Sequence, residues 1–260
     1  MPPIFKKGSR LKKGTTLRYK ITLEYDGTGF VGWQRQKSGV SVAQVLEEAI
    51  QTCTRQKVVV YGSGRTDTGV HAVGQVAHFD LEHFIDPFRL QGSINALVRP
   101  HLVCVKACET VSNDFHARFS AKRRSYLYKI QNTVYPPVLN QNKVCHFAAP
   151  LDANAMDEAA QMLVGRHDFS TFRASECQAK SPVKTLDEIH VWREDEMVYI
   201  KVAAKSFLHH QVRNFAGSLM LVGCGKWTAA DLRTAFEACD RTKGGPTASP
   251  SGLYFMEAVY

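Results

Sequence analysis

The chain has 260 residues, of which 44% are hydrophobic and 22% are charged, and its net charge is +9. This composition is typical of a soluble globular protein with one large domain or two small ones. No apolar run reaches transmembrane length and no signal peptide is found, so we expect a cytoplasmic protein without membrane contact. The excess of Lys and Arg suggests an anionic partner, usually nucleic acid, although solubility alone also explains it.

The N-terminal half begins with a basic segment and continues with six predicted elements. Five basic residues and no acidic residue occur within MPPIFKKGSRLKKG, so we expect a flexible tail over residues 1–17. The elements follow in the order strand, helix, strand, strand, helix, strand, which is the split ferredoxin-like unit. Their predicted positions are 18–25, a helix opened by a Ser41–Gln44 capping box, 57–61, 75–80, a helix opened by Asp86 and Pro87, and 102–108.

The C-terminal half repeats this order with one additional helix. Its predicted elements are a strand over 124–131, a helix from Asp152 to Val164, strands over 186–193 and 197–204, a helix from Ser206 to Val222, a helix over 229–239 and a strand over 253–260. The predicted fold class is therefore α+β. Two ferredoxin-like halves, 18–112 and 113–260, share a central, mainly antiparallel sheet and meet around a basic cleft.

A glycine-rich loop, YGSGRTDTGVHA over residues 61–72, joins two of the predicted strands. It has the glycine spacing of a phosphate-binding P-loop, but Val70 and His71 replace the lysine and the hydroxyl that such a loop needs. A dinucleotide-binding fingerprint also fails, because residue 67 is Asp instead of Gly. Zinc deaminase motifs and GxSxG are absent, and the seven cysteines include no CxxC pair, so we expect reduced cysteines and no metal site.

Arg65 and Asp67 are the candidate catalytic residues of this loop. Two residues apart in an extended stretch, they point the same way, and the guanidinium keeps the carboxylate ionised. An ionised, partly buried aspartate can act as a nucleophile or a base. The same pair can also brace a loop without any chemistry, and spacing alone favours that structural interpretation.

The stretch ARFSAKRRSYLYKIQN, residues 117–132, supplies candidate binding residues. Arg123 and Arg124 precede a strand with Tyr126 and Tyr128 on one face. Basic residues interleaved with aromatic ones suit phosphate contact and base stacking. The alternative is a strand whose tyrosines face the core.

Two more stretches contain residues of interest. In SFLHHQVRNFAGSLMLVG, Arg213 lies at the edge of an apolar helix face and is suited to a carboxylate partner such as Asp67, or else extends into solvent. In YDGTGFVGWQRQ, Phe30 and Trp33 are expected to be exposed for base stacking, with a small hydrophobic cluster as the alternative.

These stretches together resemble the bacterial-type tRNA pseudouridine synthase A family. The resemblance rests on GSGRTDTGVHAVGQVAHF, ARFSAKRRSYLY, SFLHHQVRNFAGSL and YDGTGFVGWQRQ, and it runs from about residue 18 to the end. It implies isomerisation of uridine to pseudouridine at positions 38, 39 and 40 of the tRNA anticodon stem-loop. It also implies two α+β halves, a homodimer that binds tRNA, and no metal, nucleotide or redox cofactor.

The resemblance further implies a role for four residues. Asp67 matches the catalytic aspartate, and Arg65 matches the neighbouring arginine that helps take the base out of the stack. Tyr126 matches the tyrosine that stacks on uracil, and Arg213 matches the basic residue that pairs with the aspartate. Ser125 stands where the family often has another basic residue, which affects RNA affinity and not the chemistry.

A non-catalytic RNA-binding protein built from two ferredoxin-like modules is the alternative interpretation. The RNP1 string expected of such a protein is absent, and the loop with Arg65 and Asp67 has no purpose in it. A purely structural protein also leaves the basic charge unexplained. Without the resemblance, the residues indicate a basic α+β protein that binds RNA and has one candidate aspartate site.

Overall fold

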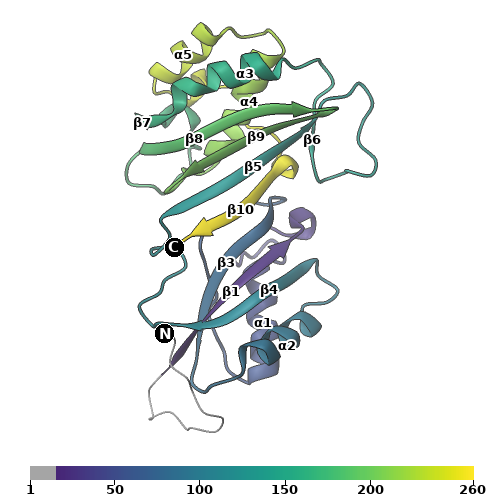
Figure 1. Ribbon diagram of the computed structural model, residues 1–260, viewed down its shortest axis with the longest axis vertical. Coiled ribbons are helices and arrows are strands. Elements are labelled where there is room, and N and C mark those ends of the chain that lie inside the picture. Colours follow the sequence, from purple (N-terminus) through teal and green to yellow (C-terminus); the bar gives the residue numbers. More distant parts are fainter. Residues whose placement is uncertain (1–15) are drawn as a thin grey trace. The chain divides into compact units, whose positions relative to one another are not determined.

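The computed structural model describes residues 16–260, which divide into two compact units whose elements are labelled in Figure 1. Unit 1 extends to Lys122 and also includes Phe255–Tyr260, while unit 2 comprises Arg123–Tyr254. The boundary expected from the sequence lies between residues 112 and 113. Residues 1–15 of the expected basic tail lie outside the described residues, and Leu17 belongs to the first strand.

Unit 1 has the predicted order of strands and helices, and β1 pairs antiparallel with both β3 and β4, as β2 does with β3. The strand order is β4-β1-β3-β10, with β2 beside β3. The elements are β1 (Leu17–Tyr25), η1 (Gly27–Gly29), α1 (Val42–Thr54), β2 (Tyr61–Gly62), β3 (His71–Leu81), α2 (Pro87–Leu97), β4 (Val103–Val111) and the greater part of β10 (Leu253–Val259).

The core of unit 1 follows from the alternation of side chains along its strands. In β1 every second residue is buried, and α1 and α2 cover one side of the sheet (Figure 1). The buried residues of β1 are Leu17, Tyr19, Ile21, Leu23 and Tyr25. The intervening residues of β1 lie on the opposite face, which these helices do not cover.

Helix starts in unit 1 agree with the sequence in part. Asp86 accepts a hydrogen bond from the backbone N–H of Arg89, with Pro87 in the first turn, as predicted. Ser41 caps α1 by accepting from the N–H of Gln44 at 3.3 Å. The Gln44 side chain donates to Glu48 instead of returning to Ser41, so the reciprocal capping box is wrong.

The strand predicted over 57–61 is largely absent. Only Tyr61 and Gly62 pair with β3. The reason is visible at Val60, whose backbone N–H donates to the Glu47 carboxylate of α1 at 3.1 Å instead of joining the sheet. This contact holds Val60 beside α1, directly before the glycine-rich loop.

Unit 2 contains its predicted elements except the last strand, most of which belongs to unit 1 as β10, and it has two short strands that the sequence did not indicate, β6 and β7. Its strand order is β5-β9-β8-β7; those pairs are antiparallel, and β6 is parallel to β5. The elements are β5 (Arg123–Gln131), β6 (Cys145–His146), α3 (Ala153–Ala160), η2 (Gln161–Leu163), β7 (Gly165–Asp168), η3 (Ser170–Phe172), β8 (Val183–Glu194), β9 (Met197–Ala204), α4 (Gln211–Gly223), α5 (Ala229–Glu237), η4 (Arg241–Lys243) and η5 (Pro250–Gly252). The α+β class with a mainly antiparallel sheet is confirmed.

The start of α4 differs from the prediction. The helix begins at Gln211, and Ser206 does not cap it. His210 has φ +62°, a left-handed conformation that a continuous helix from Ser206 would not allow. The Gln211 side chain accepts from the N–H of Leu208 at 2.7 Å and closes this turn.

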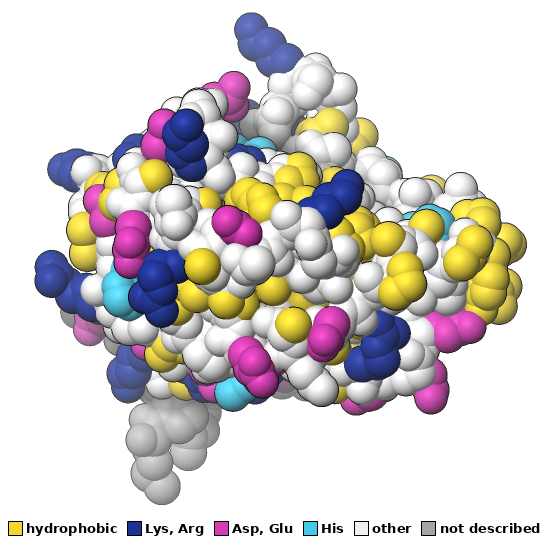
Figure 2. Space-filling view, turned by 90° about the horizontal axis from the view of Figure 1, so that it is seen from above, with side chains coloured by type: hydrophobic (Ala, Val, Ile, Leu, Met, Phe, Trp, Pro, Cys, Tyr) yellow, Lys and Arg dark blue, Asp and Glu magenta, His cyan; other side chains and the backbone are white. Residues whose placement is uncertain are grey.

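Two properties of the described chain bear on its partners. On the face seen in Figure 2, Lys and Arg side chains are interspersed with Asp and Glu, so the positive charge is not gathered there. Within residues 16–260, no helix has both the length and the apolar character that a membrane span requires.

Candidate active site

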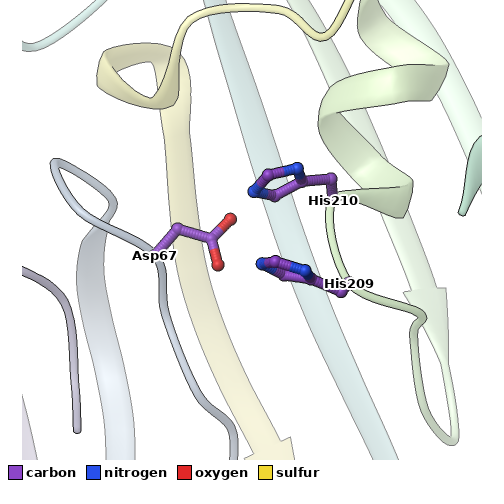
Figure 3. A group of neighbouring side chains, drawn as sticks. All are labelled: Asp67, His209 and His210. Atoms are coloured by element: carbon purple, nitrogen blue, oxygen red, sulfur yellow. The ribbon is translucent and has the colours of Figure 1, made fainter. Parts of the chain in front are cut away.

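The loop between β2 and β3 contains Arg65 and Asp67. Burial alternates along it: Arg65 is exposed, Thr66 is buried and Asp67 is half-buried. This alternation places Thr66 on the inner side of the loop and its two neighbours on the outer side. Figure 3 draws Asp67 on this loop, and His209 and His210 in the segment that precedes α4.

The inner side of the loop is held by buried hydrogen bonds. The Thr66 hydroxyl bonds to the hydroxyl of Tyr25 at 2.7 Å, and the Thr66 carbonyl accepts from the N–H of Trp33 at 3.0 Å. Ser63 donates to the Gln75 side chain, which in turn donates to the Gly64 carbonyl at 2.9 Å. These contacts hold the backbone that precedes Asp67, and none of them uses its carboxylate.

Close backbone packing explains one glycine of the YDGTGFVGWQRQ stretch. Gly32 has φ +103°, and a Cβ added there would lie 2.5 Å from the carbonyl oxygen of Thr66. A side chain at position 32 would therefore displace the residue that precedes Asp67. The stretch 27–33 therefore packs directly against the backbone of the Asp67 loop.

The expected exposure of Phe30 and Trp33 is wrong. Their side chains are 5% and 4% exposed. Trp33 packs 6.3 Å from the ring of Tyr25, and Phe30 packs 6.0 Å from the ring of His101. Their burial agrees with the hydrophobic alternative, and stacking of either ring on a base stays a prediction.

His71 is a buried residue of this site that sequence reasoning missed. Its Nδ1 accepts from the N–H of Gly27 at 3.0 Å and lies 3.1 Å from an Asp26 carboxylate oxygen. Asp26 also caps η1 through the N–H of Thr28. The signal was present in the sequence, because His71 lies at the end of the glycine-rich stretch and Asp26 and Gly27 directly follow the first strand.

Tyr126 lies on β5 of unit 2, opposite Val202 of β9. Its side chain is 8% exposed, and the Phe207 ring meets it edge to face at 5.1 Å. This contact fixes the plane of the tyrosine ring.

The two neighbouring arginines have different surroundings. Arg124 is buried and donates to the carbonyl of Lys205, which joins β5 to the end of β9. Arg123 is half-buried and forms an ion pair with Glu188 at 2.8 Å. Burial would raise the pKa of the Glu188 carboxyl, but Lys201 and Arg123 outweigh burial and the pKa is lowered.

Arg213 lies in the first turn of α4 and is half-buried. Its Nε donates to the carbonyl of Ala248 at 2.8 Å, and the N–H of Ala248 donates back to the Arg213 carbonyl at 3.2 Å. Gly217 continues this packing, since a Cβ there would lie 1.7 Å from the carbonyl oxygen of Pro246. The segment 245–248 thus contacts both the backbone and the guanidinium of Arg213 and positions this side chain.

Cys177 is the second feature that sequence reasoning missed. Its sulfur accepts from the N–H of His209 at 3.4 Å, and Arg173 donates to the Cys177 carbonyl at 2.7 Å. Burial raises the pKa of the thiol, but hydrogen bonds from the backbone and from Arg173 outweigh it and the pKa is lowered. These contacts attach the segment before α4 to the loop that follows η3.

The structure thus brings Arg65 and Asp67 together on one loop of unit 1, and it places Tyr126 and Arg213 on β5 and α4 of unit 2. The pairing of Arg213 with Asp67 stays a prediction. In unit 1 the carboxylate is on a rigid support, which suits a nucleophile or base. In unit 2 the arginine and the tyrosine are each positioned by neighbours within that unit.

The chain is similar to known proteins along most of its length. A family model described as tRNA pseudouridine synthase matches residues 21–120 and 159–260. The tRNA pseudouridine synthase A of Rhodospirillum rubrum is 55% identical over 244 residues, which cover 94% of this chain and 88% of that protein. The tRNA pseudouridine synthase A of Rhizorhabdus wittichii is 52% identical over 243 residues, 94% of this chain and 96% of that protein.

Proposed function

The chain belongs to the tRNA pseudouridine synthase family, and from this membership we propose that it isomerises uridine to pseudouridine at positions 38, 39 and 40 of the tRNA anticodon stem-loop. The observation that carries the proposal is the 55% identity over 94% of the chain. The rigid support of the Asp67 loop adds to it, because a nucleophile needs a fixed position.

The reaction rearranges one nucleotide. The bond from N1 of uracil to C1′ of the ribose breaks, and a bond from C5 to C1′ forms. The C5 proton leaves and N1 gains a proton, so no cosubstrate is required. The protein must extract the base, hold it while it turns, and supply a nucleophile or base.

Asp67 is the proposed nucleophile. It can attack C6 of the base or C1′ of the sugar, or assist loss of the C2′ proton. Its support is indirect: the loop contacts fall on Thr66, Ser63 and Gly64, and the half-buried carboxylate lies on the other side. Arg213 is the proposed partner that keeps the carboxylate ionised.

Arg65 and Tyr126 are proposed to handle the base. Extrusion of a stacked base costs a few kcal/mol. The exposed Arg65 side chain can occupy the space that the base leaves, and the Tyr126 ring can stack on the uracil. Arg123 and Arg124 are proposed RNA contacts, and the hydrogen bond of Arg124 to the Lys205 carbonyl would hold its side chain beside the end of β9.

We also propose that the protein works as a homodimer, as the family resemblance implies. Sedimentation velocity at micromolar concentration checks this separately from the chemistry. A dimer supports the proposal, and a monomer that is active on tRNA overturns it.

The positions of modification are tested by carbodiimide labelling. Pseudouridine retains the carbodiimide adduct through alkaline treatment and then stops reverse transcription. We expect new stops at 38, 39 or 40 in tRNA transcripts that have uridine there, and none in transcripts with cytidine at those positions. Stops elsewhere in the tRNA would contradict the proposed positions while leaving the reaction in place.

A further inference from the structure

One face of the unit 1 sheet is not covered by α1 and α2 and presents a cluster of rings. Lys20 of β1 and Tyr61 of β2 are both register partners of His78, so the three side chains share a face. Tyr19 and Phe79 are one residue along and lie on the opposite, buried face. The cluster therefore lies on the face opposite to α1 and α2, where His78 is 1% exposed because the segment with Phe115 and His116 packs on it.

The rings are packed against one another. Tyr61 stacks on His78 at 5.1 Å with 21° between the planes. His116 lies 4.6 Å from His78 and 5.8 Å from Tyr61, and Phe119 lies 4.3 Å from His116. The outer members of the cluster remain accessible: Tyr61 is 49% exposed and Phe119 is 75% exposed.

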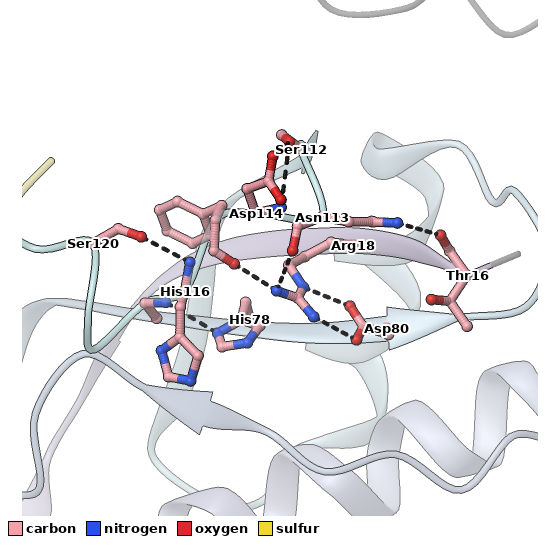
Figure 4. Close-up of polar contacts among 11 residues, drawn as sticks. Thr16, Arg18, His78, Asp80, Ser112, Asn113, Asp114, His116 and Ser120 are labelled. Carbon is pink, nitrogen blue, oxygen red and sulfur yellow. Dashed lines mark hydrogen bonds and ion pairs between the residues drawn. The ribbon is translucent and has the colours of Figure 1, made fainter.

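The segment that carries His116 and Phe119 is fixed to the sheet, as Figure 4 shows in part. Arg18 donates to the carbonyls of Asn113 and Phe115 at 2.7 Å, and it is held by Asp80. His78 Nδ1 accepts from the N–H of Ala117 at 3.1 Å. His116 Nδ1 accepts from the N–H of Arg118 at 3.1 Å and closes the turn.

The surroundings of the rings favour a nucleic acid. The guanidinium of Arg118 lies 5.7 Å from the centre of the Phe119 ring. Burial lowers the pKa of both His78 and His116, so the two imidazoles are neutral at neutral pH and the positive charge comes from arginine. Exposed rings beside a cation are the combination that binds unpaired bases, because the base stacks while the cation contacts the phosphate.

We propose that Tyr61, His116 and Phe119 form a stacking platform for an unpaired base of the RNA substrate, with Arg118 beside it for the adjacent phosphate. Tyr61 lies in β2, at the start of the stretch that leads to Asp67, and His116 and Phe119 lie in the segment between β4 and β5. The platform rests on the proposed function only in taking RNA as the substrate.

Equilibrium binding of a tRNA transcript tests the platform, measured by fluorescence anisotropy beside an RNA duplex that has no unpaired bases. We expect Phe119→Ala to weaken tRNA binding by about ten-fold and to leave duplex binding within about two-fold. Phe119→Tyr keeps the ring and should bind tRNA as the parent protein does. Phe88→Ala is the matched control, since Phe88 is 82% exposed on α2 of the same unit.

Three results would overturn the platform. They are a Phe119→Ala protein that binds tRNA as tightly as the parent, one that loses affinity for tRNA and duplex equally, and one that changes only its oligomeric state in sedimentation. Tritium release from C5-labelled tRNA by the parent protein reports the proposed reaction separately. Without release, a selective loss of tRNA binding in Phe119→Ala still supports the platform; with release, unchanged binding removes only the platform.

Discussion

At the scale of single residues, Asp67 depends on neighbours that perform no chemistry. Tyr25 is one of them, and burial raises the pKa of its hydroxyl to about 12, so it stays neutral as it bonds to Thr66. Sequence motifs drew attention to Asp67 itself. They did not show that the loop rests on a tyrosine from β1.

Replacing Tyr25 by Phe removes the hydrogen bond to Thr66. We expect a loss of about 1 kcal/mol in the free energy of unfolding and a fall in kcat with little change in KM for tRNA. Urea unfolding and steady-state kinetics measure the two effects. Tyr19→Phe is the matched control, because its buried hydroxyl bonds to Ile85 instead of the loop; equal kcat losses in both variants would contradict this role for Tyr25.

A second prediction at the scale of single residues concerns Gly32. Gly32→Ala places a methyl group against the Thr66 carbonyl at a left-handed φ, so we expect a loss of about 1–3 kcal/mol in stability together with reduced activity. Gly29→Ala is the control, since its Cβ would meet nothing within 4 Å. Thermal unfolding and tritium release compare them, and a Gly32→Ala protein as active as the parent would show that the loop tolerates the shift.

At the scale of secondary-structure elements, His78 of β3 attaches the segment between β4 and β5 to the sheet. Burial and the nearby Arg18 lower the pKa of His78 from 6.5 to about 4. Below about pH 6.5 the unfolded chain takes up a proton at this residue that the folded chain does not. The free energy of unfolding should therefore fall as the pH drops from about 6.5 to about 4.

His78→Asn tests this contribution, because the amide oxygen can accept from the N–H of Ala117 without titrating in this range. Urea midpoints at about pH 7 and about pH 4.5 should differ less in the variant than in the parent. His116 adds an effect of the same sign in both proteins, since its pKa is also lowered. An identical pH dependence of parent and variant would exclude His78 as a source.

A comparison of predicted and observed elements shows which parts of the fold can be predicted from the sequence. Period-two and helical patterns predicted the order of the elements along the chain, because each element buries one continuous face. They did not show that most of the last strand, β10, belongs to unit 1 instead of closing the second half. The prediction of a strand at 57–61 was largely wrong because the Val60 N–H donates to the Glu47 carboxylate instead of pairing in the sheet. The predicted start of α4 was wrong because hydrophobic periodicity does not reveal a left-handed residue such as His210. The exposure expected for Phe30 and Trp33 was wrong for a similar reason, since their burial arises from tertiary packing against His101 and Tyr25.

For the whole molecule, the net charge of +9 leads us to expect salt-sensitive binding of RNA. Each phosphate contact releases counterions, so we expect tRNA affinity to fall on the order of 10³-fold between about 50 and 200 mM salt if about six phosphates are contacted. Anisotropy titrations across that range measure the slope. A flat salt dependence would mean that the basic charge serves solubility and that tRNA is held by other contacts.

The most direct test of the proposed reaction is tritium release from a tRNA transcript labelled at C5 of uridine, because pseudouridine formation must expel that hydrogen. We expect release by the parent protein and a fall of at least about 10³-fold in both Asp67→Ala and Asp67→Asn, with tRNA binding retained. Equal release by the parent and the variants would mean that Asp67 is not the nucleophile. No release by the parent from any tRNA with uridine at 38 to 40 would contradict the proposed reaction.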